Sequence, residues 1–422
     1  MRQNHELNDE KRLNFKDVTL YFLYTTVLEK TPNFQKIHKD YPNWKIEDEK
    51  IDERLYHPRY IHAVSPTKVI IIPPLRLRGI DINSFNSIVL LHENIYQKLV
   101  ENKPKILDDV TLNVKIRVYP GNMCSFILRL VLSGEYEAEH LIALINGLLD
   151  HESKVILQSG ESVTLTHILS FYYPALLNST SDPQKTFSFY ETFSLIVPKY
   201  IEPELKVEEY FKEPFNYCLF GIAIRRIEHF RDFNMELTKQ TQKNLALYDS
   251  EIVILNYHNM FAYVSEKHLS VGVYLRIVES LKVLAALLHY YDITTYKQLS
   301  TIEKFPTKLR ELKHITEELE ANRINALRTI DTFRMLTSAS ATRVKMLMDH
   351  GIRIFGLNPI EESLDYKLRE IEELLAKQYN LQLQKQLQVM TILLAIFSIL
   401  ITVIEVIGVD RFVEFVRRLF GG

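Results

Sequence analysis

The C-terminal part of the chain constrains the fold most, because it reads as one long helix that ends in an apolar run. We expect this helix to extend over residues 359–409, with a charged and Gln-rich stretch followed by apolar residues 389–409. At about 1.5 Å per residue, the apolar part is roughly 30 Å long, which matches the hydrocarbon core of a bilayer. The sequence therefore predicts a stalk helix at 356–388, a single transmembrane helix at 389–409 and an amphipathic tail at 410–422.

The composition is that of a folded protein rather than a disordered one. The chain has 422 residues, of which 46% are hydrophobic and 25% charged, enough for two modest cores. Its 12 Gly are few, whereas its 23 Tyr and 22 Phe are many, which favours helices and short loops. A formal net charge of −2 gives no general attraction to nucleic acid, so no nucleic-acid partner is expected.

The cysteines and the N-terminal residues indicate a cytoplasmic body. Cys124 and Cys218 are the only cysteines and lie far apart, without the spacing of a disulfide framework or a zinc site. Residues 1–17 are polar and contain no apolar run typical of a secretory signal. We therefore expect a single-pass protein of the cell membrane with the bulk of the chain in the cytoplasm.

The first 200 residues carry the clearest strand patterns. Apolar and polar residues alternate over 112–118, turn residues follow at 119–122, and an apolar run covers 123–132, which together predict a hairpin. Further strands are expected at 60–64 and 68–72, and helices at 84–100 and 137–149, whereas 18–27 fits a strand or a buried helix equally well. Residues 1–200 are therefore predicted to form a mixed α+β cytoplasmic domain.

Residues 201–355 are predicted to form a helical domain. A proline-rich stretch at 173–214 suggests the boundary, 216–227 reads as one last strand, and helices are expected from residue 248 onward. Arg276, Glu279 and Lys282 interrupt the apolar residues 271–291 and argue against a lipid-exposed span there. The overall fold class is thus α+β, with a helical bundle, a long stalk helix and one C-terminal transmembrane helix.

A sharp corner is expected where the stalk begins. Gly356 suits a helix C-cap, Asn358 an N-cap, Pro359 the first helical position and Glu361 the third position of a capping box.

An apolar row follows along the stalk, with Leu364, Leu368, Ile371 and Leu375 as its first members. It fits packing on the preceding helix of the same chain, which begins after Pro306, and it also fits self-association into an oligomeric stalk.

No motif for catalysis, phosphate binding or metal binding is present in the sequence. We therefore expect no catalytic residue, no cofactor and no metal site, and hence no enzyme. Glu405 stands out as an acid inside the apolar run, where acids are rare and often functional. Either it lies at the depth of the lipid headgroups, or several chains place a ring of carboxylates around a cation pore.

The segment LDYKLREIEELLAKQYNLQLQKQLQVMTILLAIFSILITVI, placed after an α+β body, resembles the CorA-like divalent-cation transporter superfamily. The resemblance implies a cytoplasmic domain that leads into a long helix, which becomes a transmembrane helix, and an oligomer around a pore. The family's Gly-Met-Asn motif and second transmembrane helix have no counterpart here, so no site residue is carried over from the family.

Three functions follow as expectations. The first is a membrane-anchored cytoplasmic oligomer that acts as a sensor or effector, for example in bacterial stress or defence, through clustered C-terminal helices. The second is a CorA-like cation channel or transporter with a reduced membrane domain, and the third is a membrane-tethered scaffold without a pore. The expected partners are the lipid bilayer, further copies of the chain and a protein bound to the cytoplasmic domain.

Overall fold

A computed structural model describes residues 13–28, 31–48, 66–81, 110–149, 154–177, 191–212, 215–225, 243–264, 270–302, 309–338 and 342–420. The chain forms two compact units, the first comprising residues 1–294 and 324–364 and the second comprising 295–323 and 365–422. The predicted strand at 60–64 and the predicted helix at 84–100 lie outside the described residues.

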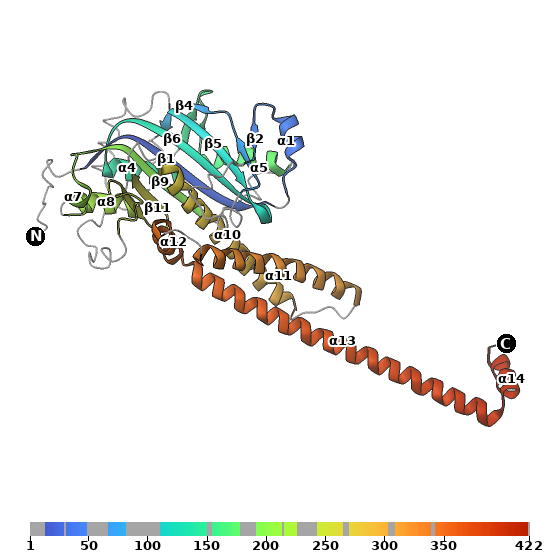
Figure 1. The fold of residues 1–422 in the computed structure, drawn as a ribbon. Coiled ribbons are helices and arrows are strands. Elements are labelled where there is room, and N and C mark those ends of the chain that lie inside the picture. Colours follow the sequence, from blue (N-terminus) through green and yellow to red (C-terminus); the bar gives the residue numbers. More distant parts are fainter. Residues whose placement is uncertain are drawn as a thin grey trace, which may run out of the picture. The chain divides into compact units, whose positions relative to one another are not determined.

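The first unit is built on a mixed sheet of eleven strands (Figure 1). Its main path runs β10-β11-β9-β1-β6-β5-β4-β7-β8, and β3 pairs with both β5 and β2. The pairing of β11 with β9 is parallel, and the other described pairings are antiparallel. The strands are β1 (Asn14–Val27), β2 (Lys45–Glu47), β3 (Lys68–Ile71), β4 (Leu75–Asp81), β5 (Val110–Val118), β6 (Met123–Glu137), β7 (Lys154–Leu157), β8 (Ser162–Val163), β9 (Glu191–Glu202), β10 (Ile252–Leu255) and β11 (Asn259–Tyr263).

The predicted hairpin is confirmed as β5 and β6. Its register pairs Leu112 with Leu130 and Val118 with Cys124, and the connection is a short 3₁₀ turn at Pro120–Asn122. The predicted helix that follows is α4 (Ala138–Leu149), which buries a nearly continuous set of aliphatic side chains in the sheet's main core. The strand expected at 68–72 is confirmed as β3.

The open choice at residues 18–27 resolves as a strand. β1 pairs with β6 on one side and with β9 on the other, so it lies in the interior of the sheet. Phe15, Leu20, Phe22 and Tyr24 join the main hydrophobic core. Since both partner strands are remote in sequence, the local pattern could not decide between strand and helix.

Strand β9 occupies part of the proline-rich stretch that suggested a domain boundary, and the expected boundary at residue 200 falls inside it. Pro198 lies opposite Val18, next to an irregularity of β1 at which Asp17 has a φ of 49°. On the other side of β9, the described pairing with β11 covers residues 194–196 of β9. The ladder on that side therefore ends before Pro198, where a residue without an N–H donor is tolerated.

Two sequence-based assignments between residues 215 and 265 are wrong. Residues 216–227 were expected to form a strand, but Phe215–Ile224 is helix α8, which contacts α4 and β11. This run is apolar on all sides, so its period does not distinguish a buried helix from a strand. Helices were expected from residue 248 onward, but β10 and β11 come first and extend the sheet.

From residue 270 onward, the described residues are almost all helical. The predicted core helix at 271–291 is part of α10, which buries Tyr274, Ile277, Leu281, Leu284 and Leu288. Besides α4 and α8, the described helices are α1 (Phe34–Asp40), α5 (Leu165–Leu177), α7 (Val207–Tyr210), α10 (Ser270–Ile302), α11 (Leu309–Ser338), α12 (Thr342–Ile354), α13 (Leu357–Ile407) and α14 (Val409–Phe420).

The second unit has a small core of its own. Leu319 of α11 and Ile371 of α13 are buried against each other, with Leu299, Leu374 and Leu375 packed around them. The first part of the stalk row therefore packs within the chain. On the exposed side of the stalk, Arg369 forms a salt bridge with Asp365, at 2.7 Å.

Candidate functional site

Helix α13 contains the chain's candidate membrane segment. Residues Leu383–Val406 form 24 consecutive helical positions that are long and apolar enough to cross a bilayer, and none of this window is buried. At about 1.5 Å per residue the segment is roughly 36 Å long. The predicted span was 389–409. The segment therefore starts six residues earlier than predicted, at residue 383, and also ends three residues earlier, at residue 406.

Burial changes abruptly along this single helix. Ile371 is 1% exposed, whereas Leu394 is 66% exposed and Phe397 is 61% exposed. Full burial of one such side chain is worth about 1.5–3 kcal/mol, so a whole helix surface of this kind is strongly unfavourable in water. A second surface, either lipid or protein, would remove this cost.

Glu405 lies in this segment, and its side chain is exposed two residues before α13 ends. Gly408 then adopts a φ of 83°, a conformation that glycine adopts without steric cost, and separates α13 from α14. In α14, the exposed Val409, Val413 and Val416 recur at four and three residues along one side of the helix, and charged residues such as Arg417 and Arg418 fall between these positions. The helix at 409–420 is therefore amphipathic, a type that favours the membrane interface.

The predicted corner is present at Gly356. Its φ is 62°, and its N–H donates to the carbonyl of Arg353 at 3.2 Å, as at many helix C-termini. Helix α13 begins at Leu357, so Asn358 and Pro359 are its second and third residues and not the predicted N-cap and first helical position. The Glu361 carboxylate bonds to Arg334 rather than completing the predicted capping box.

Two polar contacts within the first unit hold the start of α13. The Glu361 carboxylate accepts hydrogen bonds from Nε and Nη2 of Arg334 on α11, at 2.9 and 2.6 Å. Ser363 donates to Asp292 of α10 at 3.0 Å. The first turns of the stalk are thereby fixed to α10 and α11.

A buried charge cluster lies where α10 meets the β5–β6 hairpin. The Glu279 side chain is fully buried and pairs with Arg117 of β5. It also accepts hydrogen bonds from Ser125 and from the Tyr119 hydroxyl, the latter at 2.6 Å, and Arg276 lies 3.5 Å away. One carboxylate thus faces two guanidinium groups and two hydroxyl groups.

This environment determines the protonation of the cluster. Burial by itself would raise the pKa of Glu279, but Arg117, Arg276 and the two hydroxyl donors outweigh burial, so the pKa is lowered. The Tyr119 pKa is raised, first by burial and then by the neighbouring Glu279. Glu279 is therefore charged and Tyr119 is neutral at pH 7.

Lys282, one turn further along α10, lies in an aromatic cage and is 0% exposed. Its Nζ is 4.0 Å from the ring centre of Phe355, 4.5 Å from that of Tyr257 and 5.5 Å from that of Phe193. These rings come from the end of α12, the β10–β11 turn and β9. The cage connects α10 to the sheet and to the residue just before the Gly356 corner.

The sequence marked Arg276, Glu279 and Lys282 only as charges in an apolar helix. Their partners Arg117 and Phe193 lie more than 80 positions away in sequence, and no local pattern connects them. Among the described residues there is no group of three or more His, Cys, Asp or Glu side chains that could hold a metal ion.

Comparison of the chain with protein-family models, with curated protein sequences and with solved structures finds no match.

Proposed function

We propose that this protein is a membrane-anchored, homo-oligomeric sensor or effector. In this proposal the α+β body remains in the cytoplasm, α13 carries the chain into the membrane, and the clustered C-terminal helices act on the bilayer. The observation that carries the proposal is the continuity of α13, which extends over 51 residues from buried packing into the exposed apolar segment.

The stalk supports the oligomeric part of the proposal. Ile371 packs against Leu319 of the same chain. Further along the same row the apolar side chains are exposed: Leu383 to 40%, Leu387 to 56% and Met390 to 60%. Copies of the same row would bury one another in a parallel helix bundle. A partner protein on the body would supply or receive the signal.

A CorA-like cation channel with a reduced membrane domain is the second candidate. It is favoured by the layout of an α+β body that leads into one long helix and then an apolar segment. In this candidate, Glu405 from each chain would form a carboxylate ring near one end of the membrane segment.

Flotation with liposomes tests the anchoring. We expect the full-length protein to float with the vesicles, and Leu394→Arg to reduce flotation strongly, because a charge at the centre of a span costs about 2.5–3.5 kcal/mol on insertion scales. The control Gln386→Arg adds the same charge at the polar end of the segment and should leave flotation unchanged. Equal flotation of both variants would contradict a spanning helix.

The mass of the protein in detergent and the release of a dye or cation from vesicles separate the remaining functions. A monomer would exclude both the clustered effector and the channel. An oligomer that leaves vesicles sealed would favour the scaffold without a pore.

A further inference from the structure

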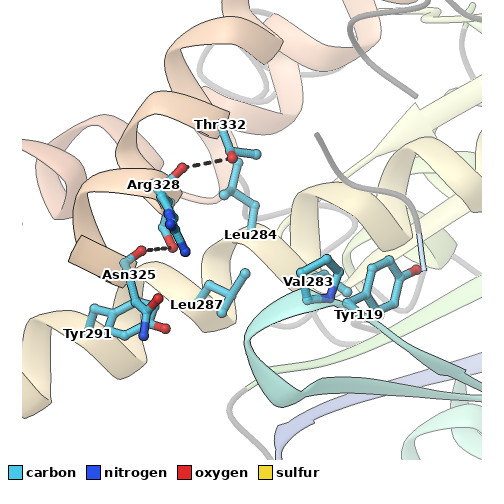
Figure 2. Close-up of a pocket in the computed structure, with 10 residues that line it drawn as sticks. Tyr119, Val283, Leu284, Leu287, Tyr291, Asn325, Arg328 and Thr332 are labelled. Carbon is cyan, nitrogen blue, oxygen red and sulfur yellow. Dashed lines mark hydrogen bonds between the residues drawn. The ribbon is translucent and has the colours of Figure 1, made fainter. Parts of the chain in front are cut away.

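The first unit contains a cavity of about 150 Å³ between α10, α11 and the β5–β6 turn (Figure 2). Its walls are mainly apolar and include Val283, Leu284 and Leu287 of α10 and Pro120 of the turn. Tyr119 lies at one end of the cavity. Its hydroxyl is already bonded to Glu279 and Arg276, so only its ring is available to a ligand. This part of the cavity would therefore receive an apolar group.

The rest of the lining carries unused polar groups. Tyr291, Asn325 and Arg328 line the cavity, and Figure 2 draws them together at the side of the view away from Tyr119. Within the described ranges, the side chains of these three residues make no hydrogen bond or ion pair. Burial raises the pKa of Tyr291 to about 12, so its hydroxyl remains protonated and able to donate.

The hydroxyls of the neighbouring threonines do not compete for a ligand. Thr329 donates to the carbonyl oxygen of Asn325 at 3.0 Å, and Thr332 donates to that of Arg328 at 2.8 Å. The groups left for a ligand are thus a guanidinium, a carboxamide and a phenol. A guanidinium binds a carboxylate through two parallel hydrogen bonds, and the other two groups can donate to the same oxygens.

Size limits the apolar part of the ligand. An apolar cavity of about 150 Å³ accommodates one benzene ring. A bare inorganic anion would leave the apolar walls without a partner, and a purely apolar molecule would leave the guanidinium unused.

We propose that this cavity binds a small organic acid, whose single ring or short branched chain packs on the α10 wall and whose carboxylate is bound by Arg328, Asn325 and Tyr291. The site belongs to the body and does not depend on how the C-terminal helix meets a membrane. Acid binding and flotation are measured separately, so a negative result for acid binding does not contradict membrane anchoring, and a negative flotation result does not contradict acid binding.

The test is calorimetric titration of the full-length protein in detergent with benzoate as the probe. We expect saturable binding with a dissociation constant of about 1 mM or tighter, as for an efficient ligand of this size. Arg328→Gln should weaken binding by roughly threefold to tenfold, because it removes a charge-assisted contact that is partly screened by water at this exposed residue. The control Lys345→Gln removes one positive charge from an exposed position on α12 and should leave binding unchanged.

A second variant tests the location from the apolar side. Leu287→Trp places a larger side chain in the cavity and should abolish binding. Arg328→Gln should keep the thermal transition of the wild type, which would show that its loss of binding is not a loss of folding. Benzyl alcohol and inorganic phosphate are the comparison ligands, and each should bind at least tenfold more weakly than benzoate. The proposal is overturned if benzoate does not bind, if Arg328→Gln binds it as well as the wild type, or if either comparison ligand binds equally well.

Discussion

Replacing Glu279 with Gln should strongly destabilise the body. The substitution keeps the shape of the side chain but removes the charge that faces Arg117 and Arg276, whose side chains are only 10% and 12% exposed. Two guanidinium groups would then share a nearly dry site without a carboxylate. Breaking a buried ion pair in this way costs about 3–5 kcal/mol.

Urea unfolding of the full-length protein in detergent measures this loss. Trp44 is the only tryptophan, is 8% exposed and stacks on Tyr41 with ring centres 4.3 Å apart, so its fluorescence reports unfolding of the same unit. The control Asp48→Asn removes the ion pair with Lys68, in which the Asp48 side chain is 81% exposed. Such an exposed pair is worth only about 0–1 kcal/mol.

The pH dependence gives a second readout for the same variant. The pKa of Glu279 is lowered from its ordinary value of 4.5, so its contribution is fully present above that value and is lost as the pH falls through the lowered pKa. The difference in stability between wild type and Glu279→Gln should be constant near neutral pH and shrink below about pH 4.5. A variant that unfolds at the wild-type urea concentration throughout would refute the role assigned to the carboxylate.

Three further perturbations test other parts of the structure. Gly356→Ala should destabilise the protein by about 1–2 kcal/mol because Gly356 has a positive φ, whereas Gly272→Ala on α10 should stabilise it by about 0.4–1 kcal/mol. An added Cβ meets nothing within 4 Å at either site, so thermal unfolding of the two variants compares the backbone effect alone. The pKa of His350 is lowered, first by burial and then by Arg353, so stability should fall as the pH drops below about 6.5; the same pH series on His350→Gln should lack this loss, and an identical loss would contradict it. If the C-terminal helices form a cation pore, Glu405→Gln should reduce cation flux into vesicles severalfold at unchanged protein content, and unchanged flux would remove Glu405 from the pore.

The sequence predicted the parts of the fold whose signals are local. The alternation at 112–118 and the turn at 119–122 define the β5–β6 hairpin, and Gly356 marks the corner before α13. The apolar run similarly predicted a span at 389–409 without any tertiary information, and this range overlaps the apolar helical segment Leu383–Val406.

The parts that were left open or assigned wrongly depend on contacts between distant residues. The open choice at 18–27 is decided by the pairing of β1 with β6 and β9, and the apolar run expected to be a strand at 216–227 forms helix α8 instead. The cluster around Glu279 joins α10 to residues of β5 and β6 that lie about 150–160 positions earlier, as their sequence separations show. Only the folded sheet brings these groups together.

The depth of α13 in a bilayer tests the central claim most directly. An environment-sensitive fluorophore would be attached at Ile396→Cys or, as the matched control, at Lys377→Cys on the stalk, both in a Cys218→Ser background because Cys218 is only partly buried whereas Cys124 is buried. In liposomes, we expect the probe at position 396 to be strongly quenched by lipids brominated on their acyl chains and the probe at position 377 to remain unquenched. Equal and weak quenching at both positions would show that the apolar segment does not enter the membrane.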